Sequence, residues 1–263
     1  MIFIPIFIFC LGLLVGSFLN VVIFRLNTGR SVVTGRSRCD RCDRTLSWYE
    51  LVPVFSFLGL RGKCRSCQTE LSFQHPIIEL LTGIVFALLY TTIVMADPLS
   101  LVTWATFVFA LVISSLLIVI TVYDFKHKIV PDKIVYPFIL ISFLSVFWGL
   151  FFGGATFNLL NALIAGPALA LPFFLLWFFS QGRAMGFGDV KLALGIGWLV
   201  GIEGSLTVFL LSFWIGAIVG LFLLAISKRH SFKSEVPFAP FMITALAITV
   251  IWGITVQQIF PLW

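Results

Sequence analysis

Long apolar runs, separated by short polar segments, dominate the chain. A helix of about 20 apolar residues is long enough to cross the hydrocarbon core of a bilayer. The hydrophobic pattern therefore predicts an all-α polytopic membrane protein with about eight transmembrane helices. The first run has neither a preceding basic residue nor a small-residue cleavage site, so we interpret it as a retained span and not a signal peptide. The expected spans are residues 2–24, 77–95, 100–123, 134–152, 158–179, 190–202, 205–226 and 239–260.

The apolar stretch before Lys228 is the least regular part of this pattern. As one helix of about 35 residues it would be about 52 Å long, and it would place Lys191 and Lys228 on opposite sides of the membrane. Two short crossings, broken near Gly201, Glu203 and Gly204, would keep both lysines on one side. A re-entrant segment at 190–202 would do the same, and the sequence does not distinguish the two arrangements.

Charge is scarce and strongly segregated. Hydrophobic residues make up 60% of the chain and charged residues 11%, too little charge for a soluble domain. The loops in which the basic residues gather alternate with loops that carry only Asp97 and Glu203. The positive-inside rule then predicts that the basic loops are cytosolic and that both termini lie outside. This segregation also argues against nucleic acid as the partner of the net charge of +6.

Small residues in the first span predict close helix packing. Gly12 and Gly16 form a Gly-x-x-x-Gly pair, which allows two backbones to approach each other. Asn20 lies about one turn further along nearly the same face. We expect its side chain to bridge two helices by hydrogen bonds.

The only large segment outside the expected spans, residues 27–76, contains two Cys-x-x-Cys pairs. Each pair can offer two thiolates to a tetrahedral ion, and four thiolates would make a closed, structural Zn²⁺ site in a small ribbon-like loop. Two disulfides are the alternative, but the charge pattern places the loop in the cytosol, where thiols stay reduced. The expected ligands are Cys39, Cys42, Cys64 and Cys67.

Two aspartates at the ends of apolar runs are the candidate catalytic residues. Asp124 ends the third expected span and Asp189 precedes the sixth. Carboxylates so close to lipid are costly, and two that face each other can share one proton and activate a water molecule. Asp189 could instead cap a helix. Gly186 and Gly188, however, permit unusual dihedral angles and close approach of a substrate backbone, so we also assign them to the active-site backbone.

Asp132 and His127 are weaker candidates for catalytic residues than this pair. Asp132 competes with Asp124 as the partner of Asp189, but it follows a proline directly before the fourth span, an ordinary helix start. Asp124 ends a helix, where the dipole disfavours an acid, so its placement needs another reason. His127 lies among lysines and is interpreted as a solvated residue.

Glu79 and Lys191 are lesser candidates. Glu79 lies about one turn inside the second span, where it could either interact with the helix dipole or face a substrate or cofactor. Lys191 lies two residues after Asp189 and is a second candidate to face substrate or cofactor.

The order of these motifs resembles the bacterial type IV prepilin peptidases, nearly from end to end. The matching segments are residues 16–26 (GSFLNVVIFRL), the paired Cys-x-x-Cys motifs, 48–54 (WYELVPV), 76–83, 124–132 and 186–191 (GFGDVK). The last resembles the Gly-x-Gly-Asp pattern of presenilin-like proteases. Phe24 and Asn27 depart from the family, which often has Tyr and Pro there.

The resemblance implies a bifunctional enzyme of the bacterial cytoplasmic membrane. It would cut a short basic leader from prepilins or pseudopilins at the cytosolic face, with Asp124 and Asp189 carrying hydrolysis. It would then methylate the new N-terminal amine with S-adenosylmethionine, whose site the residues do not reveal. The expected division is a first helix at 1–26, a zinc-binding loop domain at 27–76 and a protease bundle at 77–263.

Three alternatives stay open at this point: a peptidase without methyl transfer, a transporter that binds a cation, and an assembly scaffold. No internal repeat is evident, which weighs against a repeat-built transporter. The sequence indicates neither the pilin-like substrate nor the oligomeric state.

Overall fold

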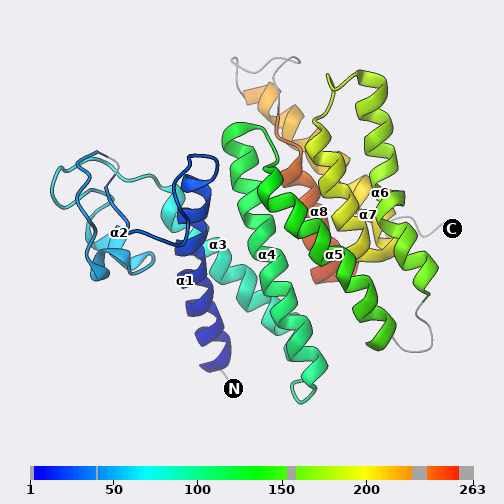
Figure 1. Cartoon of the computed structure of the whole chain (residues 1–263), viewed down its shortest axis with the longest axis horizontal. Coiled ribbons are helices and arrows are strands. Elements are labelled where there is room, and N and C mark those ends of the chain that lie inside the picture. The colour runs from blue at the N-terminus through cyan, green and yellow to red at the C-terminus, as the bar shows by residue number, and fades with distance from the viewer. Residues whose placement is uncertain (1–2, 40, 153–157, 227–235, 255–263) are drawn as a thin grey trace. The chain divides into compact units, whose positions relative to one another are not determined.

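Helices account for nearly all regular structure in the computed structural model, which describes residues 3–39, 41–152, 158–226 and 236–254. The all-α polytopic fold class is confirmed: six helices in this part of the chain are long and apolar enough to cross a membrane. They are α1 (Phe3–Arg25), α3 (Gln74–Leu89, continued by the π-helical turn η2, Tyr90–Val94), α4 (Leu101–His127), α5 (Asp132–Phe152), α6 (Leu159–Ser180) and α7 (Phe187–Ile226) (Figure 1). The shorter elements are η1 (Trp48–Leu51), α2 (Phe55–Gly59) and α8 (Ala239–Trp252).

Helix α7 contains the break that the charge pattern predicts. Its 40 residues include one with non-helical dihedrals, Gly201, at φ 73° and ψ −178°. That φ lies in the region that only glycine enters without strain. The two parts of α7 run in different directions in Figure 1, so they correspond to the expected segments 190–202 and 205–226. With α7 counted as two, the described helices supply the eight expected segments. The last residues of the span expected at 239–260 lie outside the described part.

The chain divides into two compact units, Met1–Val119 and Ile120–Trp263. The boundary falls within α4. It differs from the division into helix, loop and bundle expected from the sequence. That expected division is based on proposed function and stays a prediction.

In the first unit, α1 and α3 pack with almost no space between their backbones. A Cβ atom on Gly12 would lie 2.6 Å from the Cα atom of Gly83, and one on Gly16 would lie 2.7 Å from the Cα atom of Glu79. The Asn20 amide donates to the carbonyl oxygen of His75 at 3.2 Å, so it links the two helices. The Gly-x-x-x-Gly and asparagine predictions are therefore confirmed.

The second unit is built around α7, which packs against α5, α6 and α8. Glycines again permit the approach: a Cβ atom on Gly197 would overlap the backbone of Ala165 on α6. The Trp198 indole donates to the carbonyl oxygen of Leu163 at 3.0 Å and fixes the same pair of helices. The first part of α7, which begins with the Gly-x-Gly-Asp sequence, is thereby held rigidly.

Candidate functional sites: a cysteine cluster and a pair of aspartates

The two Cys-x-x-Cys pairs form two turns with the same hydrogen bonds. The Cys39 N–H donates to the carbonyl oxygen of Arg44 at 3.0 Å, and the Cys64 N–H donates to that of Thr69 at 2.8 Å. Asp43 and Gln68, each four residues after the first cysteine of its pair, both adopt a positive φ. Each turn folds back on itself, so the two cysteines of a pair point to one side.

All four cysteine sulfur atoms converge. The Sγ atoms of Cys39, Cys42, Cys64 and Cys67 lie within 4.8 Å of one another, and those of Cys39 and Cys67 are 3.7 Å apart. Tetrahedral coordination at a Zn–S distance of about 2.3 Å requires sulfur atoms roughly 3.8 Å apart. The donor set therefore fits a metal ion that prefers four thiolates.

Backbone and hydroxyl donors favour thiolates at two of the four cysteines. At Cys42 the Arg44 backbone bond is outweighed by desolvation and by hydrogen bonds to the other three cysteines, which raise the pKa to about 11. The hydrogen bond between the Cys67 sulfur and the Thr69 hydroxyl, together with the Thr69 backbone, lowers the pKa of Cys67 to about 6. Backbone N–H groups of Cys67 and Ser66 lower the pKa of Cys64. The polypeptide thus stabilises negative charge at two of the four sulfur atoms before any cation is considered.

A buried ion pair connects the cysteine loop to its 3₁₀ turn. Arg44, beside the first cysteine pair, donates to the carboxylate of Glu50, whose other oxygen accepts from the Ser47 N–H at 2.8 Å. The Ser47 N–H, and then Arg44, hold the pKa of Glu50 below its usual range. We did not anticipate this pair from the sequence, although Ser47 and Glu50 have capping-box spacing.

The two candidate aspartates lie on separate helices of the second unit. Asp124 lies in the last turn of α4 and is 4% exposed; Asp189 lies in the first turn of α7 and is 8% exposed. The helix begins at Phe187, and the Asp189 N–H donates to the carbonyl oxygen of Gly186 at 3.2 Å. Asp189 is therefore inside the first turn and does not precede the helix as a cap.

The charge of Asp124 acts on Asp189, so the two carboxylates belong to one region of the second unit. Asp124 accepts a hydrogen bond from the backbone N–H of Ala239, the first residue of α8. Its other oxygen, Oδ2, is buried without a hydrogen-bond partner among the described residues. A buried acceptor without a partner is costly and is a common property of functional groups.

Gly186 and Gly188 differ in what surrounds them. Neither has a positive φ, so unusual dihedral angles are not the reason for these glycines. A Cβ atom on Gly188 would lie 2.7 Å from the Cβ atom of Val130, so this glycine permits close packing. A Cβ atom on Gly186 would lie 4.0 Å from Oδ2 of Asp189. Gly186 therefore keeps the space beside that carboxylate open.

Two further residues considered from the sequence, Lys191 and His127, contact neighbouring side chains in the second unit. Lys191 donates to the carboxylate of Asp132 at 2.7 Å and lies over the ring of Tyr136. His127 lies against the ring of Tyr123, with ring centroids 4.4 Å apart. The Lys191–Asp132 pair joins the start of α7 to the start of α5.

Glu79 lies on α3, in the first unit. It is 6% exposed, and its Oε2 atom accepts from the backbone N–H of Val54 at 2.7 Å. The bond holds the cysteine loop against the second turn of α3, a connection that spacing in the sequence did not reveal.

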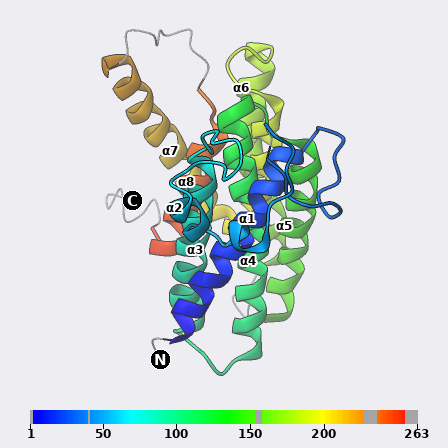
Figure 2. The same cartoon turned by 90° about the vertical axis from the view of Figure 1, so that its left-hand side faces the viewer.

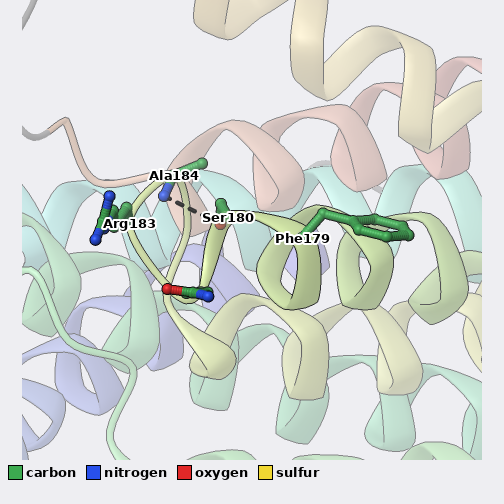
Figure 3. Close-up of a pocket in the computed structure, with 5 residues that line it drawn as sticks. Phe179, Ser180, Arg183 and Ala184 are labelled. Atoms are coloured by element: carbon green, nitrogen blue, oxygen red, sulfur yellow. Dashed lines mark hydrogen bonds between the residues drawn. The ribbon is translucent and has the colours of Figure 1, made fainter.

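A surface hollow of about 560 Å³ lies on the turn between α6 and α7 (Figure 3). It is lined by Phe179, Ser180, Gln181, Arg183 and Ala184. The Ala184 N–H donates to the Ser180 hydroxyl at 3.3 Å, which holds the turn closed. The hollow precedes the Gly-x-Gly-Asp segment and contains neither candidate aspartate.

Membrane-length helices and two buried acids fit one class of protein, the membrane-embedded peptidases of the aspartic type. Residues 10–93 match the bacterial peptidase A24 N-terminal domain, and residues 111–221 match the type IV leader peptidase family. The chain belongs to this family.

Relatives agree over most of the chain. A prepilin leader peptidase/N-methyltransferase of Myxococcus xanthus is 34% identical over 98% of this chain and 74% of its own length. Proteins of the same name from Aeromonas salmonicida and Pseudomonas aeruginosa are 30% and 28% identical, over 95% and 94% of this chain and 91% of their own lengths. No solved structure matches the chain.

Proposed function

We propose that the protein is a prepilin leader peptidase in which Asp124 and Asp189 are the catalytic pair. The observation that carries this assignment is the buried Oδ2 atom of Asp124, which has no hydrogen-bond partner in the described part of the chain and belongs to a carboxylate that interacts electrostatically with Asp189. The substrates are the precursors of type IV pilins or pseudopilins, in accordance with the names of the relatives.

The chemistry follows from two acids in one site. Like charges at close range leave one proton on the pair, so one aspartate is ionised and the other protonated. The ionised carboxylate takes a proton from water as the oxygen attacks the scissile carbonyl carbon. The protonated one donates to the carbonyl oxygen and stabilises the charge that develops there. The carboxyl group that took the water proton then gives it to the leaving amine nitrogen, and the other aspartate takes back a proton from a hydroxyl of the tetrahedral intermediate. The C–N bond breaks, and the leader departs with a new carboxyl terminus.

The surrounding residues prepare this site. The Ala239 N–H, at the start of α8, holds one oxygen of Asp124 and leaves the other available. The open side of Gly186 gives space for water or an extended substrate backbone beside Asp189. The Lys191–Asp132 ion pair fixes the first turn of α7 relative to α5.

The test is leader removal in reconstituted vesicles by variants with single substitutions. Asp124→Asn and Asp189→Asn should each lower the cleavage rate by at least about 10³-fold, as for other residues that act as one catalytic unit. Asp132→Asn is the matched control, since it removes an acid from the same region and should lower the cleavage rate by no more than a small factor. Full cleavage by either of the first two variants, with metal content and helicity intact, contradicts the assignment of that residue.

We further propose that the enzyme methylates the new N-terminal amine, as the names of its relatives state for them. The donor would be S-adenosylmethionine, which supplies an activated methyl group; we assign no residue to it. Mass spectrometry of the mature product, with and without the donor, should show the mass of one added methyl group only when the donor is present. An unmodified amine in both cases leaves a peptidase without methyl transfer.

We assign the cysteine cluster to structural Zn²⁺, because four converging cysteines close its coordination shell. The positive-inside pattern supports an inner-membrane orientation with loop and aspartates on the cytosolic side and both termini outside. The functional division is then a first helix at 1–26, a zinc loop at 27–76 and a protease bundle at 77–263. Protease access to the loop in right-side-out and inverted vesicles tests the orientation.

A transporter or an assembly scaffold would give different results. Ion flux without peptide cleavage would favour a transporter. A scaffold would keep its function in both aspartate variants and lose it on Cys39→Ser.

A further inference from the structure

The cysteine loop exposes large apolar side chains along one short segment, residues 48–58, and beside it at the start of α3. The exposed fractions are 80% for Trp48, 69% for Phe55, 65% for Leu58 and 71% for Phe73. Phe55 and Leu58 are three residues apart in α2, so they lie on one helix face. We call these four residues the loop's apolar surface. Exposed apolar residues that gather in this way mark an interaction site.

Contacts to α3 set the level of this surface relative to a membrane-spanning helix. Val54, directly before α2, donates its N–H to Glu79, five residues after α3 begins at Gln74. At 1.5 Å per residue, that bond lies about 7.5 Å along the helix axis. The rings of Phe57 and Phe73 also meet, with centroids 5.3 Å apart. Figures 1 and 2 agree that α2 lies beside α1, at the height of its helical turns and not beyond its end.

Charge in the same segment complements an anionic bilayer surface. Arg61, Lys63 and Arg65 follow α2 directly and are exposed. Arg65 also lies over the ring of Tyr49, with its guanidinium carbon 5.7 Å from the centroid. Basic side chains can extend towards lipid phosphates while aromatic and aliphatic side chains enter the boundary between headgroups and acyl chains.

We propose that the loop's apolar surface docks onto the headgroup region of the membrane that α1 and α3 span, and that anionic phospholipid is its ligand. The docking surface is continuous with the lipid-facing surface of α3, because Val54 is fixed to Glu79 and Phe57 to Phe73. The metal-binding loop would then be held against the bilayer as an interfacial element of the kind that binds through apolar burial and anionic attraction. This proposal does not depend on the peptidase function.

Photo-crosslinking in the full-length protein tests the docking. A benzophenone amino acid replaces Phe55 in one variant and Val33, which is 88% exposed in the same loop but lies outside the surface, in the control. Both variants are reconstituted in vesicles of phosphatidylcholine alone or mixed with phosphatidylglycerol, irradiated, and analysed by intact-protein mass spectrometry. We expect several-fold more phospholipid adduct at position 55 than at position 33. In the mixed vesicles, the fraction of adducts formed with phosphatidylglycerol should exceed its mole fraction in the lipid.

Equal lipid adducts at the two positions would overturn the proposal. So would a position-55 adduct that forms only with an added pilin precursor, which would assign the surface to a protein partner. Adduct at position 55 without preference for phosphatidylglycerol would refute anionic lipid as the ligand.

Hydrogen exchange supplies an independent measurement without an unnatural residue. Amides of residues 48–60 should exchange more slowly in phosphatidylglycerol vesicles than in neutral ones, and Phe55→Ser/Leu58→Ser should abolish this difference. Val33→Ser is the control, since Val33 is 88% exposed in the same loop but lies outside the surface. A double variant that retains bound metal and the full lipid-dependent protection would contradict the docking.

Discussion

The cysteine cluster and the aspartate pair are both polar sites in a largely apolar protein, yet they differ in the hydrogen-bond partners that the fold gives their polar atoms. In the cysteine loop, backbone N–H groups and the Thr69 hydroxyl surround the sulfur atoms, and Glu50 has donors at both oxygens. In the second unit, Asp124 keeps a buried oxygen without a partner among the described residues. The fold therefore supplies hydrogen-bond donors around the first site, whereas it leaves one acceptor oxygen of the second site available.

This contrast distinguishes side chains that stabilise the fold from side chains that take part in a reaction. A metal site of four thiolates gains folding energy when its donors are fixed. An acid that must take and return protons needs an oxygen that the fold has not already saturated, and the fold tolerates the cost of burying it. Substitutions at the two sites should therefore separate activity from folding.

The largest expected effect is on catalysis by the aspartate pair. The double variant Asp124→Asn/Asp189→Asn should lose no more activity than either single variant, because two residues that act as one unit are strongly non-additive. Thermal unfolding of all three variants should match or exceed that of the unaltered protein, since each removes a repulsive or unpartnered charge. Additive losses in rate, or a clear loss of stability, would show that the acids act separately or support the fold.

Removal of the metal should produce the next largest effect, which we expect on the folding of the cysteine loop and not on the aspartate pair. Cys64→Ser, or prolonged chelation, should make the loop sensitive to added protease, because few apolar contacts remain to hold so short a segment. Limited proteolysis with mass spectrometry would locate the cuts. The helices of the second unit should stay protected; a loop that resists protease without metal would contradict a structural role for the ion.

The sequence predicted the spans and the cysteine ligands but not the contacts between distant segments, for physical reasons. The lipid requires about 20 apolar residues per crossing, and metal ligands need fixed spacing, so the spans and cysteines could be recognised locally. The break at Gly201 followed from keeping lysines on one side. The bond from Val54 to Glu79 and the pair of Lys191 and Asp132 join segments far apart in the chain, which no local pattern records.

The helix start at Phe187 was also outside the reach of the sequence. The apolar run begins at Val190, and Asp189 could cap a helix that starts there, so the expected sixth span began at residue 190. In the structure the helix includes Gly188, where a Cβ atom would lie 2.7 Å from that of Val130, a contact between distant segments that the sequence does not record.

The two glycines before Asp189 offer a smaller effect that compares packing with catalysis. Gly188→Ala should cost about 1–3 kcal/mol of stability, because its Cβ atom would overlap that of Val130. Gly186→Ala meets nothing so close and should leave the unfolding temperature unchanged, but it narrows the space beside Asp189. Denaturant or thermal unfolding and the cleavage rate should thus rank the two variants in opposite senses. An unimpaired cleavage rate in Gly186→Ala would exclude a need for that space.

The smallest expected effect concerns the ion pair of Lys191 and Asp132, whose side chains are 18% and 60% exposed. An ion pair at this level of exposure contributes about 0.2–1 kcal/mol. Lys191→Met should keep the stacking over Tyr136 while removing the charge, and Asp132→Asn should remove the other partner; a double-mutant cycle in unfolding free energy measures their coupling. If Lys191 only positions α7, both variants should reduce the cleavage rate by the same small factor. A much larger loss of cleavage rate in Lys191→Met than in Asp132→Asn would instead show that the lysine contacts substrate or cofactor.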